Sequence, residues 1–163
     1  MPPRPGTWPG RPAMGCAARP SGGRLGRSAG RADGKKAGLD KAGAGIVGRG
    51  AQVLPCRLEV SQAAEVEARG AATVKRFGAP HFVFNNAGVG AGGLIWETTL
   101  KDWEWVVGVN LMGVAHGIRV FVPMMLEAAA KDPTYEGHIT STASMARLLT
   151  APNLGVYNAT TNA

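Results

Sequence analysis

Short apolar runs alternate with longer stretches of helical periodicity throughout residues 51–163, and this alternation constrains the fold more than any other feature. Residues 51–55 form a short apolar segment of the kind found in strands. A helix is predicted to begin at Ser61, which suits an N-cap, and to end before residues 78–80. The apolar residues of this stretch recur at helical spacing: Val66, Val74 and Phe77.

The same order continues toward the end of the chain. Residues 81–84 are an apolar run that leads into a tight-turn sequence, which predicts a second buried strand. From residue 99 to about residue 130 a helical period is interrupted near Asn110, which indicates two consecutive helices. Residues 137–142 are a third strand candidate, and residues 157–163 open another helix. This order predicts an α/β fold in which a parallel sheet carries helices on both faces.

Residues 1–50 differ in composition, and we predict that they are a disordered basic segment rich in Gly, Pro and Arg. They contain ten basic residues and two acidic ones, a net charge of +8; since the whole chain carries +7, residues 51–163 carry −1. Before Ile46 no apolar run is longer than a few residues, so the segment would bury too little apolar surface to offset its ordering entropy. The folded domain is therefore predicted to span residues 51–163.

The composition argues against several classes of protein. We find neither the apolar stretch of a secretory signal nor a run of roughly 18 apolar residues that would span a membrane. Cys16 and Cys56 give neither a disulfide framework nor metal-ligand spacing. Residues 1–50 lack the interleaved aromatic residues of nucleic-acid-binding segments, so nucleic-acid binding and organelle targeting remain weaker alternatives for them. We expect a cytoplasmic protein with no metal, membrane or nucleic-acid partner.

Two polar clusters follow predicted strands, and ligands of open parallel sheets bind beyond the carboxyl ends of the strands. Four landmarks then occur in order: the NNAG sequence at residues 85–88, Asn110 in VNLMG, Ser144 in STASMA, and Tyr157 thirteen residues later. Each alone has an ordinary explanation as a turn former, a loop hydroxyl or a half-buried aromatic residue. In this order and spacing they resemble the short-chain dehydrogenase/reductase family, which implies an incomplete Rossmann-like sheet.

The resemblance implies a role for each landmark. Tyr157 would be the general acid/base that exchanges a proton with the substrate oxygen, and Ser144 would hydrogen-bond the same oxygen. Asn110 would hold a water in a proton relay. The cofactor would be NAD or NADP, and the part of it near the ribose would be lined by Asn86, Ala87 and Gly88. Glu59 stands where the family has an acidic residue that contacts the adenine, although surface charge is an alternative explanation.

The chain also departs from the family pattern. The family has a lysine four residues after the tyrosine, which favours ionisation of the tyrosine and binds the nicotinamide ribose; here that position is Thr161, which carries no charge. Residues 43–48 match G-x-G-x-x-G, but no strand precedes them and no helix follows, so they do not predict a phosphate loop. The family's first two strands, which in its sheet lie between the strands at residues 51–55 and 81–84, are expected to be missing, because residues 1–50 show no sign of them. The sequence is thus expected to be a fragment without the glycine-rich loop and the C-terminal part.

The sequence therefore predicts an oxidoreductase that interconverts a small-molecule alcohol and a carbonyl by hydride transfer, with impaired activity. The alternative is an inactive remnant whose helices between residues 100 and 130 mediate association. The family resemblance also implies a homo-oligomer.

Overall fold

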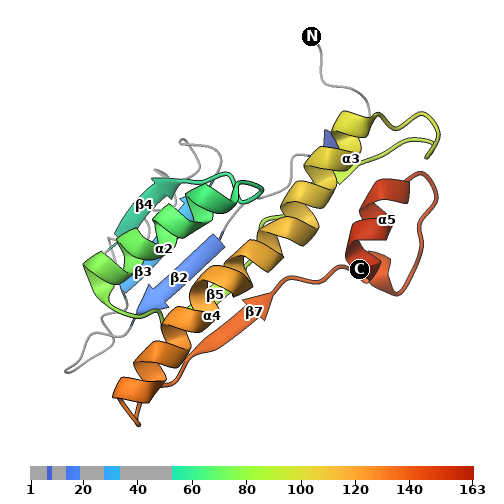
Figure 1. Cartoon of the computed structure of the whole chain (residues 1–163). Coiled ribbons are helices and arrows are strands. Elements are labelled where there is room, and N and C mark those ends of the chain that lie inside the picture. The colour runs from blue at the N-terminus through green and yellow to red at the C-terminus, as the bar shows by residue number, and fades with distance from the viewer. Residues whose placement is uncertain (1–6, 9–13, 19–27, 34–52) are drawn as a thin grey trace.

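The computed structural model describes residues 7–8, 14–18, 28–33 and 53–163 (Figure 1). Its main sheet has the strand order β4-β3-β2-β5-β7. In chain order these strands are β2 (Met14–Ala18), β3 (Ser28–Asp33), β4 (Val53–Arg57), β5 (Phe82–Asn85) and β7 (His138–Ser141). β4 pairs with β3, and β5 with β7, in parallel, whereas β2 runs antiparallel to both of its neighbours. A separate antiparallel pair joins β1 (Thr7–Trp8) to β6 (Gly90–Ala91).

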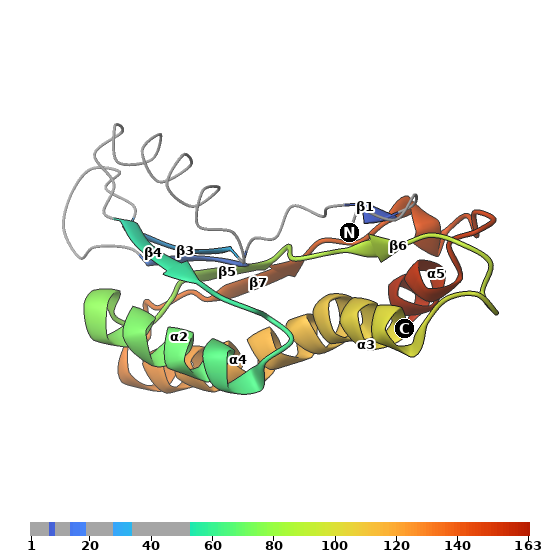
Figure 2. The same ribbon diagram turned by 90° about the horizontal axis from the view of Figure 1, so that it is seen from above.

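Helices α2 (Ala63–Phe77) and α4 (Gly113–Lys131) lie side by side on one face of this sheet (Figure 2). α3 (Leu100–Val107) continues into α4 through a π-helical turn, η1 (Gly108–Met112). A 3₁₀ turn, η2 (Met145–Arg147), and helix α5 (Gly155–Asn162) complete the described part of the chain. α5 packs against α3, η2 and β6, at the end of the molecule away from β4.

Local sequence explains where these helices begin and end. At the start of α3, Thr99 and Asp102 form a capping box: the Thr99 hydroxyl accepts from the Asp102 N–H, and the Asp102 carboxylate accepts from the Thr99 N–H. α2 ends at Gly78, which has a φ of 81° and donates its N–H to the carbonyl of Val74. The start of α3 and the end of α2 are therefore both capped by hydrogen bonds.

The predicted α/β fold with a Rossmann-like sheet is confirmed, with two differences in detail. The strands expected at residues 51–55, 81–84 and 137–142 are β4, β5 and β7. The two helices expected to meet near Asn110 are present, but they join through the π turn without a break. Helices were expected on both faces; among the described residues, those packed on the main sheet lie on one face.

Residues 1–50 differ from the prediction of a wholly disordered segment, because β1, β2 and β3 lie within them. β2 and β3 occupy the positions between β4 and β5 that were expected to be empty. Pairing with neighbouring backbone on both sides can hold such strands without the apolar side chains on which the prediction relied. The G-x-G-x-x-G match at residues 43–48 falls outside the described residues.

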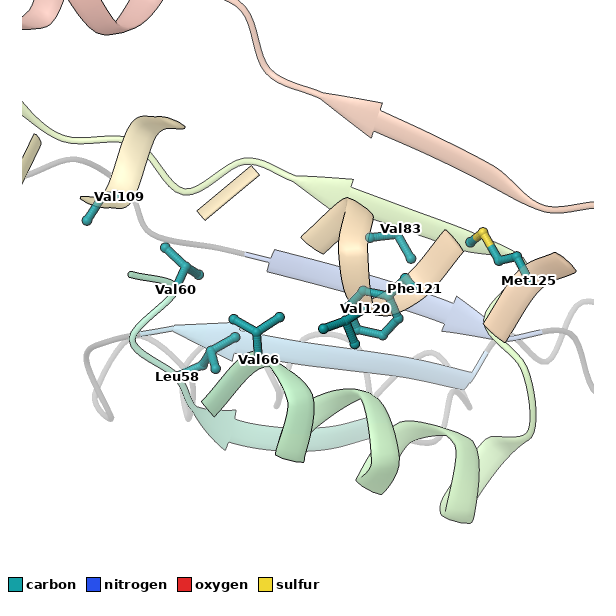
Figure 3. Packing of buried hydrophobic residues seen from close by; sticks show 8 residues of the cluster. All are labelled: Leu58, Val60, Val66, Val83, Val109, Val120, Phe121 and Met125. Carbon is teal, nitrogen blue, oxygen red and sulfur yellow. The ribbon is translucent and has the colours of Figure 1, made fainter. Parts of the chain in front are cut away.

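The main hydrophobic core lies between the sheet and helices α2 and α4 (Figure 3). Phe121 of α4, Val66 of α2 and Val83 of β5 are all fully buried within it. The cluster comprises Leu58, Val60, Val66, Val83, Val109, Val120, Phe121 and Met125. A second cluster of Ala91, Val106 and Val156 joins β6, α3 and α5. The first core builds the sheet-and-helix layers, and the second attaches α5 to them.

By length and composition, the continuous helix from Leu100 to Lys131 could cross a membrane, a possibility that the sequence analysis had not identified. Core helices of soluble proteins pass the same test. Here Val106, Val120 and Phe121 belong to the two hydrophobic clusters, so packing explains the apolar character of one side of this helix.

Gly113 permits α4 to pass close to the segment that follows β4. A Cβ at this position would lie 2.8 Å from Cγ2 and 3.2 Å from Cβ of Val60. Alanine is favoured over glycine in helices by roughly 1 kcal/mol, but overpacking costs about 1–3 kcal/mol, and the Val60 Cβ cannot rotate away. We therefore expect Gly113→Ala to lower the free energy of unfolding by about 1–2 kcal/mol in urea denaturation. Ala115→Ser, at an exposed position of the same helix, is the control; a stabilised Gly113→Ala variant would contradict this packing.

Candidate active site

The carboxyl ends of β5 and β7 form a shared polar rim. Because these strands are parallel, the residues that follow them meet. The Asn85 side-chain amide donates to Ser141 Oγ at 3.3 Å, and the main-chain carbonyl of Asn85 accepts from the Thr142 N–H at 2.9 Å. The Thr142 hydroxyl donates to Asn86 Oδ1 at 2.6 Å. The structure thus brings together the two polar clusters that the sequence placed on one rim.

Asn110 lies in the π turn and is bound to the chain that leaves this rim. The wider turn closes with a hydrogen bond from the Gly113 N–H to the Gly108 carbonyl. Asn110 Oδ1 accepts from the Val89 N–H at 2.9 Å, and Nδ2 donates to the Val89 carbonyl at 2.9 Å. The second hydrogen of Nδ2 goes to Thr160 Oγ1 at 3.0 Å. Both amide hydrogens are therefore donated to protein oxygens, and a relay water at Asn110 stays a prediction.

Tyr157 is half-buried on α5, beside the short strand β6. Its ring lies over Gly90: a Cβ built there would be 3.7 Å from Tyr157 Cδ2. The preceding residue, Val156, is 1% exposed and packs with Ala91 and Val106. This apolar contact holds the tyrosine helix against β6 and α3.

Ser144 is half-buried at the N-cap of η2, and its hydroxyl accepts from the Ala146 N–H at 3.2 Å. A hydroxyl has a single hydrogen, so this contact occupies an acceptor site and leaves the O–H available to donate. Asn162 of α5 donates to the Ala146 carbonyl at 3.4 Å, and η2 packs against α5. The turn that carries Ser144 is therefore attached to the helix that carries Tyr157.

Asn86, Ala87 and Gly88 connect the end of β5 to this arrangement, and all three are half-buried. A Cβ at Gly88 would lie 3.8 Å from Asn110 Oδ1, an ordinary contact distance, so the turn runs directly beside the π turn. Together with Ser144 and Tyr157 these residues fit the nicotinamide and ribose end of a cofactor at a strand-end rim. Position 161, where the family has a lysine, fits the cofactor less well. The Thr161 hydroxyl donates to the Asn158 carbonyl at 3.1 Å, and residues 155–162 of α5 include no charged side chain.

Glu59 lies apart from the other predicted site residues. It follows β4, while Asn86–Gly88 follows β5, and β3 and β2 separate these strands. Its carboxylate accepts from the Ser61 hydroxyl at 3.2 Å, and its side chain is exposed. It borders an open hollow of about 380 Å³ between the end of β4 and α2. An adenine contact at Glu59 stays a prediction.

Two polar residues of α5 escaped the sequence analysis. Asn158 is 7% exposed and donates to the Ala151 carbonyl at 2.9 Å; Thr160 is 9% exposed and contacts Asn110. Helical spacing could have identified Thr160, which lies three residues after Tyr157 and therefore on the same side of the helix. No sequence signal identified Asn110 as its partner.

The chain is similar to known proteins of one family. The sequence model of the short chain dehydrogenase family matches residues 26–163. The CLA biosynthesis dehydrogenase/reductase of Lactiplantibacillus plantarum is 31% identical over 114 residues, which cover 70% of this chain and 38% of that protein. The short chain dehydrogenase tazN of Aspergillus terreus is 35% identical over 113 residues, covering 69% of this chain and 24% of that protein.

Solved structures show the same likeness. A short chain dehydrogenase/reductase from Burkholderia phymatum in complex with NAD is 46% identical with a TM-score of 0.75, covering 80% of this chain and 45% of that one. An NAD⁺-bound xylitol dehydrogenase is 26% identical with a TM-score of 0.73, covering 80% of this chain and 48% of that one. This chain spans less than half the length of each of these four proteins.

The Asn110 amide should contribute measurably to stability. We expect Asn110→Leu to lower the free energy of unfolding by about 1–3 kcal/mol, because it leaves the Val89 N–H and carbonyl without their partner. Thr142→Ala removes an exposed rim hydrogen bond and serves as the control, with an expected loss within about 0.5 kcal/mol. Equal losses in urea denaturation would contradict the role assigned to Asn110.

Proposed function

Because the chain belongs to the short-chain dehydrogenase family, we propose that it is an oxidoreductase that interconverts a small-molecule alcohol and a carbonyl compound with NAD or NADP. The observation that carries this proposal is the attachment of the Ser144 turn to the Tyr157 helix, with Asn110 joining that helix to the rim of β5. The NAD complex of the Burkholderia phymatum relative supports the choice of cofactor.

The proposed chemistry assigns a proton to Tyr157 and a hydrogen bond to Ser144. In the reductive direction, the Tyr157 hydroxyl gives its proton to the carbonyl oxygen of the substrate, and in the oxidative direction it takes the proton back. The free O–H of Ser144 donates to the same oxygen and stabilises the negative charge that develops on it. The nicotinamide, when bound, supplies or accepts the hydride at the substrate carbon, so the two electrons and the proton are accounted for.

The rim residues would hold the cofactor. Asn86, Ala87 and Gly88 would contact it near the nicotinamide ribose, since they are half-buried beside Asn110. Glu59, at the end of β4, would contact the adenine. We also propose that the protein is located in the reducing cytoplasm, and the free thiol of Cys56 is in keeping with this location.

Thr161 is expected to lower the activity of this chain. An ammonium at this position would favour the ionised form of the neighbouring tyrosine, whereas the threonine hydroxyl is neutral and is bonded to the Asn158 carbonyl. Tyr157 therefore has to exchange its proton without a charged group on its own helix. We propose a rate well below that of an enzyme that has the lysine.

An assay of NADH and NADPH oxidation with a panel of aldehydes and ketones tests the catalytic proposal. Tyr157→Phe should abolish turnover because it removes the exchangeable proton, and Thr161→Lys should raise turnover by about tenfold or more. Tyr135→Phe is the matched control, because it changes the chain's other tyrosine, whose hydroxyl donates to the Pro80 carbonyl outside the site. Burial raises the pKa of the Tyr135 phenol, so that group remains protonated at assay pH. Turnover that survives Tyr157→Phe would refute the assignment.

An inactive chain that acts through association is the second candidate, and a set of exposed apolar residues on α3, η1 and α4 favours it. Its members range from 38% to 65% exposed: Trp105, Leu111, Ile118 and Leu126. Exposed apolar residues on a helix are a common basis of subunit contacts, so we propose that the chain forms a homo-oligomer through these residues. Such an association would require neither Tyr157 nor a cofactor.

Calorimetric titration separates the two candidates. The inactive candidate predicts no NADH or NADPH binding at concentrations up to about 1 mM, whereas dissociation constants near the micromolar range would exclude it. Ile118→Glu should dissociate the oligomer in sedimentation equilibrium, because it replaces one of the exposed apolar residues of this helix by a charged one. Glu104→Ala, at an exposed charged position of α3, is the control.

A further inference from the structure

A continuous chain of hydrogen bonds connects the backbone after β5 to the backbone of Tyr157. It runs from the Val89 main chain through the Asn110 amide to Thr160 Oγ1, and from there to the Tyr157 carbonyl at 2.9 Å. Thr160 is 9% exposed, so water has little access to this last step. These hydrogen bonds connect the segment that follows β5 to η1 and then to α5, three parts of the protein far apart in the sequence.

The direction of each hydrogen bond in this series follows from the hydrogens that the side chains carry. Asn110 Nδ2 has two hydrogens, which go to the Val89 carbonyl and to Thr160 Oγ1. Since Thr160 Oγ1 accepts from Asn110, its single hydrogen is donated to the Tyr157 carbonyl. Removing the Thr160 hydroxyl would therefore break both links at once and disconnect Asn110 from the tyrosine helix.

Apolar packing alone does not fix the orientation of α5. Val156 holds the helix against Ala91 and Val106, but hydrophobic contact is non-directional and permits small rotations and shifts. Hydrogen bonds depend steeply on distance and angle, so the Asn110–Thr160 contact restricts those movements. The Tyr157 ring, which lies over Gly90, moves with the backbone carbonyl that Thr160 holds.

We propose that Thr160 is a positioning residue: by linking the Asn110 amide to the Tyr157 carbonyl, it sets the orientation of the tyrosine ring relative to the rim of β5. This role rests on the proposed function, in which Tyr157 exchanges the proton. The adjacent Thr161 shows what distinguishes the position. Its hydroxyl also donates to a carbonyl three residues earlier, that of Asn158, but it is not bonded to Asn110.

Tyrosine ring signals in NMR spectra test the proposal without any need for turnover. The chain has two tyrosines, so selective ¹³C labelling of tyrosine gives one set of ring signals for Tyr157 and one for Tyr135 as an internal reference. Thr160→Val keeps the shape of the side chain and removes the hydroxyl. We expect it to shift the Tyr157 ring signals and the Asn110 side-chain amide signals of the folded protein, with the Tyr135 signals unchanged.

Two further variants make the comparison specific. Thr160→Ser retains the hydroxyl and should restore the unaltered Tyr157 signals, whereas Thr161→Val removes a hydroxyl of the same helix and should leave the Asn110 amide signals in place. Thr160→Ala replaces Thr160→Val if the valine variant does not fold. Unchanged Tyr157 signals in a folded Thr160 variant would overturn the proposal. Unfolding of both the valine and the alanine variant would also overturn it, by showing that the hydroxyl is needed for folding as such.

Kinetics then separate this proposal from the proposed function. Where the unaltered chain reduces a carbonyl compound, Thr160→Val should lower kcat about tenfold or more and change the KM for the cofactor by less than about twofold, with recovery in Thr160→Ser. A Thr160→Val variant with unchanged kcat would overturn the positioning role. Absence of turnover in the unaltered chain would instead refute the proposed function, and the NMR comparison would still decide whether Thr160 orients Tyr157.

Discussion

The geometry of the site depends on the hydrogen bonds that the side-chain amide of Asn110 makes. It binds both main-chain polar groups of Val89 and also the hydroxyl of Thr160, so one residue joins the segment after β5, the long helix and the tyrosine helix. The π turn makes this possible, because the extra residue it contains changes the direction in which side chains leave the helix. A regular helical turn would orient the amide differently.

Apolar burial and hydrogen bonding determine different aspects of this structure. Apolar burial around Phe121 and around Val106 determines which elements lie against each other, and it tolerates small displacements. Directional hydrogen bonds then determine how they are oriented: Asn85 with Ser141 at the rim, Asn162 with Ala146 at the Ser144 turn, and the Asn110 network. The sheet itself depends on backbone pairing, since β2 joins the strands on either side of it in the antiparallel direction.

Features that depend on side-chain periodicity could be predicted from the sequence, and features that depend on backbone pairing could not. β5 and the long helix leave a clear apolar pattern, so their positions were predicted to within a few residues. β2 and β3 have glycine- and alanine-rich sequences, MGCAA and SAGRAD, without that pattern, and the sequence analysis treated them as disordered. At the site, the spacing of Asn110, Ser144 and Tyr157 could be recognised, but their partners Val89 and Thr160 depend on tertiary contacts.

Thr160 and Thr161 differ in their contacts, and this difference bears on whether a site with the correct geometry is also active. The contacts of Thr160 and Asn110 satisfy polar groups that are partly or fully removed from water, so they stabilise the fold as well as orient Tyr157. A charge at position 161 would act mainly on the ionisation of the tyrosine, and the neutral threonine found there is accommodated by a bond to Asn158. Loss of the Thr160 hydroxyl would disturb the orientation of Tyr157, whereas the threonine at position 161 leaves the contacts of Thr160 in place. The geometry around Tyr157 can therefore persist in a chain that lacks the charge at position 161.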